Sequence, residues 1–229
     1  MKTVPFNVSN ETTQSYITRV YAWMFLALLI TAIVSGLTIS SERAMTLIYG
    51  NPAVLIVLLI SELLAVWVLA SRIETMAPQT ARFLFVIYSV LNGITLSWIF
   101  VTYTERSITS TFFISAVMFG VMSFYGYVTN RDLTSAGNIL TMALVGIILA
   151  SIVNIFFKNP AIYWITNIVG VIVFVGLIAF DTQKIRKLAD DKFFYNGNSA
   201  IIGALALYLD LVNLFLLLLR MFGKRRNDW

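Results

Sequence analysis

The apolar segment from Ala200 to Leu219 constrains the fold of this chain most, because it carries Asp210 at its centre. At about 1.5 Å per helical residue, the segment is long enough to cross the hydrocarbon core of a bilayer. A carboxylate in the middle of such a helix costs about 2.5 to 3.5 kcal/mol on insertion scales. Gly203 and Asn213 fall on the same side as Asp210, and small and polar residues are typical of packed helix interfaces. We therefore predict that this helix lies inside a bundle and turns Asp210 to the interior.

Six further apolar segments of spanning length precede this one. They are Val20–Ile39, Pro52–Ala70, Ala81–Val101, Ser110–Val128, Ile139–Phe157 and Ile162–Phe180. The chain is 59% hydrophobic and 12% charged, which excludes an ordinary soluble domain. We expect an all-α polytopic membrane protein with seven transmembrane helices in one domain over residues 20–219. A cytoplasmic tail (1–19) precedes that domain and a basic tail (220–229) follows it.

The fourth segment carries Gly120, Ser123 and Gly126 at a spacing that lets helix backbones approach closely. Cations in the connections, such as Arg131 and Lys187, favour a cytoplasmic N-terminus by the positive-inside rule. Seven full crossings then place the basic C-terminal tail on the opposite side. A hairpin in the last segment would return that tail to the cytoplasm, and we favour the full crossing.

Missing residue types exclude several kinds of chemistry. The chain has neither cysteine nor histidine, which removes thiol nucleophiles, histidine-containing zinc sites and histidine-based triads. An intramembrane aspartyl protease would need a Gly-x-Gly-Asp motif, which surrounds neither Asp181 nor Asp210. The net charge of +5 comes from cations at helix ends, so it does not predict nucleic-acid binding. We expect no enzymatic activity and no cofactor.

Three acids are candidates for a function: Glu62, Asp181 and Asp210. Each also has a structural interpretation, since Asp181 could be an interfacial acid near Lys184 and Glu62 could pair with Arg72. If Asp181 and Asp210 meet within about 3 Å, the two carboxyl groups share one proton. The protonated pair would hold its two helices together, whereas the ionised pair would repel or recruit a hard cation such as calcium.

Two motifs near the C-terminus closely resemble the last two helices of the Bax inhibitor family, also called transmembrane Bax inhibitor motif or Lifeguard-like proteins. They are VGLIAFDTQKI (Val175–Ile185) and GALALYLDLVNLFLLLLRMFG (Gly203–Gly223). Further resemblance lies in LNGITLSWIF (Leu91–Phe100), MFGVMSFYGYVTNRDL (Met118–Leu133) and IVNIFF (Ile152–Phe157). The resemblance covers nearly the whole chain after the N-terminal tail.

This resemblance implies a seven-helix bundle in which the last helix is central and six others surround it. It also implies a pH-sensitive calcium leak, in which Asp181 and Asp210 form the sensor and gate and are possible calcium ligands. Glu62 matches the family's acid in the second helix, and Arg72 matches a later basic residue if the register shifts by about one residue. Asn213, one turn after Asp210, would line the ion path or take part in gating with Glu62 and Arg72.

The leading hypothesis is therefore a pH-gated calcium or cation leak in the inner (plasma) membrane of a bacterium. Its partners would be the lipid bilayer and calcium ions or protons. One alternative is a non-conducting integral membrane regulator of a membrane protease or another membrane partner, since the family also includes such regulators. A proton-coupled solute transporter is a third class, which substrate-dependent proton movement would reveal.

Overall fold

The structure is a computed structural model, and it describes residues 13–73, 75–190 and 198–226. These residues form helices and no β-strand. Seven of the helices are long and apolar enough to cross a membrane, which confirms the predicted fold class. In chain order the helices are α1 (Thr13–Ser40), α2 (Glu42–Tyr49), α3 (Pro52–Arg72), α4 (Pro78–Leu96), α5 (Trp98–Thr102), α6 (Glu105–Val128), α7 (Thr134–Phe157), α8 (Pro160–Asp190) and α9 (Ser199–Phe222).

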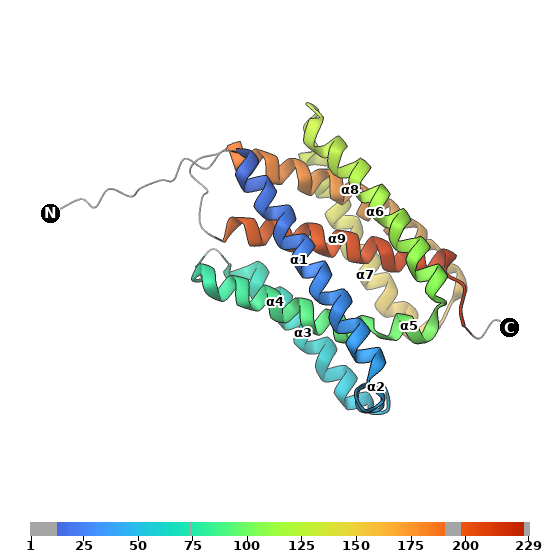
Figure 1. Cartoon of the computed structure of the whole chain (residues 1–229). Coiled ribbons are helices and arrows are strands. Elements are labelled where there is room, and N and C mark those ends of the chain that lie inside the picture. The colour runs from blue at the N-terminus through green and yellow to red at the C-terminus, as the bar shows by residue number, and fades with distance from the viewer. Residues whose placement is uncertain (1–12, 74, 191–197, 227–229) are drawn as a thin grey trace.

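Helix α9 is the centre of the bundle. It packs against α1, α4, α6 and α8, and Figure 1 shows it running through the molecule with α3 and α4 on one side and α6 and α8 on the other. Of its most apolar window, 67% is buried, against 0% for α7, which packs one side on α8 and exposes most of its other side chains. The predicted burial of α9 is therefore confirmed, and α7 lies on the outside of the bundle against α8.

The continuity of α9 distinguishes a full crossing of the last segment from a hairpin. One continuous helix runs from Ser199 to Phe222, so the hairpin alternative is wrong. Beyond it, the Arg226 backbone N–H donates to the Thr102 carbonyl at 2.9 Å, which ties the C-terminal segment to the link between α5 and α6. The start of α1 and the end of α9 lie at opposite ends of the bundle (Figure 1).

Helix boundaries differ from the apolar segments in three places. Helix α1 begins at Thr13, so residues 13–19 of the expected tail are helical, while residues 1–12 and 227–229 lie outside the described part of the chain. The link expected after Ser40 is mostly a second short helix, α2. Helix α8 continues to Asp190, well beyond the end of its apolar run at Phe180. The last difference matters most, because it places Asp181 within a helix.

The predicted third span is broken at Ser97, where α4 ends and α5 begins. The Ser97 hydroxyl donates back to the Ile94 carbonyl at 2.7 Å, a local bond that competes with the helix ladder. The Tyr49 hydroxyl lies 2.9 Å from Ser97 Oγ and also reaches the carbonyls of Ile94 and Thr95. Tyr49 thus supplies a donor where helix α4 leaves its last carbonyls free.

Close approach of α6 and α8 depends on Gly126. A Cβ built on Gly126 would lie 2.2 Å from the Ala179 carbonyl oxygen of α8, so only glycine fits there. Ser123, one turn earlier, accepts a hydrogen bond from the Thr182 hydroxyl at 3.3 Å. The predicted close contact is confirmed for these two residues. It is wrong for Gly120, beside which a Cβ would meet nothing within 4 Å.

An exposed ion pair joins the loop between α6 and α7 to the end of α8. Lys187 Nζ donates to Asp132 Oδ1 at 2.6 Å, and the hydrogen bond from Lys187 lowers the pKa of Asp132 to about 2. Nearby, the buried Gln183 side chain accepts from the Leu133 N–H at 2.9 Å and donates to the Arg131 carbonyl at 2.8 Å. These contacts hold the extended end of α8 against the rest of the bundle.

The Asp132→Asn variant should lose a contribution to stability that is constant across neutral pH. Because the pKa of Asp132 is lowered below its unfolded value of about 3.9, the ion pair stabilises the fold fully above that pH. The contribution disappears as the pH falls towards 2. Thermal unfolding of the wild type and the variant, compared at several pH values, should show an equal, small difference from about pH 8 to 5. A difference that changed between pH 8 and 6 would contradict this assignment.

Candidate functional site

The site is built around two aspartates on adjacent helices. Asp210 lies in the middle of α9 and is 4% exposed, and Asp181 lies half-buried on the extended part of α8. The side chains of Asp181 and Asp210 lie within hydrogen-bonding range of each other. We refer to these two residues as the aspartate pair. The sequence analysis proposed that Asp181 and Asp210 meet, and the structure places their side chains together.

Local packing explains why the two carboxyl groups meet. Helices α8 and α9 approach closely at Gly203, where a Cβ would come within 3.0 Å of Ile185. A second close approach lies at Gly170, where a Cβ would come within 2.9 Å of Leu217. Glycines at both places let the helix axes stay near along their length. Asp181 and Asp210 lie between these two contacts along the chain.

The surroundings of the pair favour a shared proton. Asp210 Oδ2 is buried, and no donor in the described part of the chain bonds to it. Two carboxyl groups this close in a poorly hydrated bundle repel when both are ionised, and one proton between them relieves the repulsion. Lys184 acts electrostatically on Asp181 from one turn further along α8. That cation sits on the exposed side of the helix, towards the end of the bundle.

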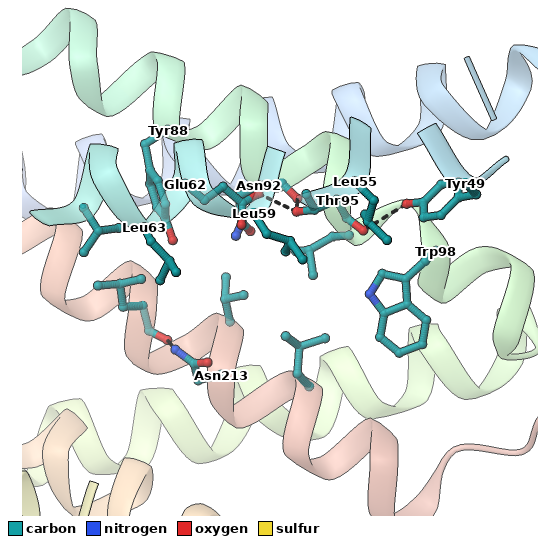
Figure 2. A pocket seen from close by; sticks show the side chains of 15 residues that line it. Tyr49, Leu55, Leu59, Glu62, Leu63, Tyr88, Asn92, Thr95, Trp98 and Asn213 are labelled. Carbon is teal, nitrogen blue, oxygen red and sulfur yellow. Dashed lines mark hydrogen bonds between the residues drawn. The ribbon is translucent and has the colours of Figure 1, made fainter. Parts of the chain in front are cut away.

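Glu62 lies in a separate place, a cavity of about 650 Å³ between α3, α4 and α9. Its carboxylate accepts a hydrogen bond from the Thr95 hydroxyl of α4 at 2.5 Å. Figure 2 shows Glu62 on the wall formed by α3 and α4, with Asn213 of α9 on the opposite wall. The Asn213 amide donates to the Leu209 carbonyl at 2.8 Å. We call this space the Glu62 cavity. Its other lining residues are Tyr49, Leu55, Leu59, Leu63, Val66, Tyr88, Asn92, Leu96, Trp98, Leu209, Val212 and Leu216.

Arg72 is placed apart from the other predicted residues. It is exposed in the last turn of α3, where its charge suits the negative end of the helix dipole. In the described part of the chain no ion pair joins Arg72 to either member of the aspartate pair or to Glu62. Its role in gating stays a prediction. The hydrogen-bond partner of Glu62 is Thr95, not Arg72.

Metal chemistry at the site is limited by the number of ligands. Among the described residues, no group of three or more acidic side chains, histidines or cysteines lies together. Calcium takes six to eight oxygen ligands, and the aspartate pair supplies only two carboxyl groups. The aspartate pair alone therefore does not complete the ligand shell of a bound calcium ion.

A buried polar cluster on α1, α4 and α9 was not predicted from the sequence. The Tyr208 hydroxyl lies 2.7 Å from Thr31 Oγ1 and donates to Asn92 Oδ1 at 3.0 Å. Thr31 in turn donates to the Ser89 carbonyl at 3.0 Å. The cluster lies two residues from Asp210 and holds that part of α9 against α1 and α4. Polar residues inside three separate apolar segments were the available signal, but their spacing does not reveal that they meet.

The Tyr208→Phe variant should lose about 1 to 2 kcal/mol of stability, because it removes both hydroxyl contacts and leaves Asn92 Oδ1 without its donor. Its ring keeps the edge-on packing against Phe85 and Tyr88. Thermal unfolding in detergent measures the loss. Tyr125→Phe, at an exposed position of α6, is the matched control and should unfold like the wild type. Equal unfolding of both variants would show that the cluster adds nothing to stability.

Comparisons with known proteins agree with this architecture. The family described as "Inhibitor of apoptosis-promoting Bax1" matches residues 13–227. The inner membrane protein YbhL of Escherichia coli K12 is 48% identical over 93% of both chains. A protein of Borreliella burgdorferi is 40% identical over 93% of both chains. Protein RP147 of Rickettsia prowazekii is also 40% identical, over 95% of this chain and 93% of its own.

Proposed function

This chain belongs to the Bax inhibitor family, and on that premise we propose that it is a pH-sensitive calcium (cation) leak gated by the aspartate pair. The observation that carries the proposal is the meeting of Asp181 with the buried Asp210 at the centre of the bundle. An intramembrane acid of this kind usually marks an ion or proton pathway. The proposal assigns no enzymatic activity.

The gate would work through the charge of the pair. With one proton shared, a hydrogen bond between the carboxyl groups holds α8 and α9 together and keeps the leak closed. With that proton lost, two negative charges in a low dielectric repel each other. Separation of α8 from α9 then opens a path past Asp210, and the paired carboxylates attract a cation into it.

The Glu62 cavity would continue the path on the other side of α9. Asn213 lies one turn after Asp210 and forms part of the cavity wall, so α9 carries both the sensor and a cavity residue. A shift of α9 at the aspartate pair would therefore move Asn213 relative to Glu62. Glu62 would provide a negative charge and Asn213 a polar group along an otherwise apolar passage.

The proposed setting is the inner membrane, with the N-terminus in the cytoplasm. The relative YbhL is an inner membrane protein. Arg131, in the loop between α6 and α7, and Lys187, near the end of α8, favour a cytoplasmic N-terminus by the positive-inside rule. The lipid bilayer is the surrounding partner, and calcium ions and protons are the species that would cross or bind.

Calcium flux into proteoliposomes from about pH 6 to 8 tests the proposal, since a shared proton on a carboxyl pair would be lost within that range. We expect flux above that of empty liposomes, rising with pH. No flux at any pH would overturn the leak. A non-conducting regulator of another integral membrane protein would then be the better interpretation, and its activity would depend on exposed helix faces.

A further inference from the structure

The Glu62 cavity has the chemistry of a ligand site, whether or not ions pass through it. We infer that it binds apolar organic monocations, such as quaternary ammonium or phosphonium compounds, that enter from the bilayer. Its volume of about 650 Å³ falls within the range of small-molecule sites, about 300 to 1,000 Å³. It combines apolar walls with few polar groups, which is the usual composition of such sites.

A single acid sets the charge of the preferred ligand. Glu62 is the one carboxylate among the residues that line the cavity, and none of these residues is a lysine or arginine. In the described part of the chain, Glu62 accepts a hydrogen bond only from the neutral Thr95 hydroxyl, so no cation there balances its negative charge. A monocation would supply that balance. An anion would meet like charge, and an uncharged lipid chain would leave the carboxylate further desolvated.

Aromatic side chains at both ends of the cavity strengthen this preference. Tyr88 lies at one end, and Trp98 and Tyr49 lie at the other, with Glu62 between them (Figure 2). Aromatic faces attract cations, and tryptophan does so best. Between these ends the leucines of α3 and α9 provide contact for the apolar body of a ligand. This arrangement suits a bulky cation better than a calcium ion, which needs several more oxygen ligands.

Access from the bilayer is open along α3. Helix α3 packs mainly on α2 and α4, and the cavity separates it from α9. Leu59 and Leu63 line the cavity and are also 45% and 72% exposed on the outside of the bundle. A ligand dissolved in lipid can therefore reach Glu62 between α3 and α9 without crossing the closely packed centre of the bundle.

Equilibrium dialysis with the full chain in lipid nanodiscs tests this inference with two probes of matched shape, tetraphenylphosphonium and tetraphenylborate. Empty nanodiscs correct for partition into lipid. We expect saturable binding of the phosphonium cation by the wild type and no excess binding of the borate anion. Glu62→Gln should weaken cation binding at least about tenfold, because it removes the charge and keeps the size of the side chain. Glu42→Gln, an exposed acid at the start of α2, is the control and should bind like the wild type.

A second variant separates charge from space. Leu59→Trp narrows the cavity beside Glu62, leaves Glu62 in place and should also weaken saturable binding. The inference is overturned if the cation does not bind, if it binds the wild type and Glu62→Gln equally, or if the anion binds as well as the cation. No ion gradient is present in this experiment, so its outcome does not depend on whether the protein conducts.

Discussion

Replacing Asp210 with asparagine is expected to remove the pH dependence of calcium flux. The amide cannot lose a proton in this range, so the repulsion that opens the gate can no longer develop between positions 181 and 210. For the wild type, the rates at about pH 8 and pH 6 should differ at least about fivefold, since a group that titrates between them changes its charge almost completely. For the variant the ratio should fall to about one, measured in the same proteoliposomes.

The Asp181→Asn variant tests whether the two residues act as one unit. If Asp181 and Asp210 share a proton, calcium flux through the Asp181→Asn variant should lose its pH dependence, as flux through Asp210→Asn does. The double variant should then differ little from either single variant, because groups that act together are not additive. Asp132→Asn is the control, because it removes an acid whose pKa lies near 2 and which stays ionised from pH 6 to 8. An unchanged pH profile in both Asp210→Asn and Asp181→Asn would contradict the proposed gate.

Substituting alanine for Gly126 is expected to give the largest loss of stability. A methyl group there would lie 2.2 Å from the Ala179 carbonyl oxygen, and this neighbour is backbone that no rotamer change can move away. Helices α6 and α8 would have to separate, which costs about 1 to 3 kcal/mol or more for an overpacked contact. Thermal unfolding in detergent should show a clearly lower midpoint for Gly126→Ala than for the wild type.

Gly120→Ala is the matched control on the same helix. Its methyl group would enter open space, so the substitution should be neutral or should stabilise the helix by up to about 1 kcal/mol. The pair of variants separates close packing from helix propensity, which acts on both positions alike. If Gly126→Ala unfolded at the same temperature as Gly120→Ala, the close contact between α6 and α8 would not contribute to stability. Ala179 lies two residues before Asp181, so we also expect Gly126→Ala to alter calcium flux.

Much of the architecture was predictable from the sequence, because it depends on local properties. The length and hydropathy of each segment predicted seven spans, and the high cost of a charge in lipid predicted that Asp210 faces the interior. The resemblance in the last two helices predicted that α9 is central. Such signals lie within single segments, so they do not depend on knowing which helices are neighbours.

Which residues meet was decided only by the tertiary structure. Asp181 reaches Asp210 because α8 continues beyond its apolar run, and Gly126 but not Gly120 faces another helix because of where α6 crosses α8. The buried polar cluster of Thr31, Asn92 and Tyr208 and the Glu62 cavity likewise join residues from three or more helices. Hydropathy determines that a segment crosses the membrane, but in lipid every apolar face is equally acceptable. The rotation and crossing of each helix are therefore determined by close packing and by polar contacts between segments far apart in the chain.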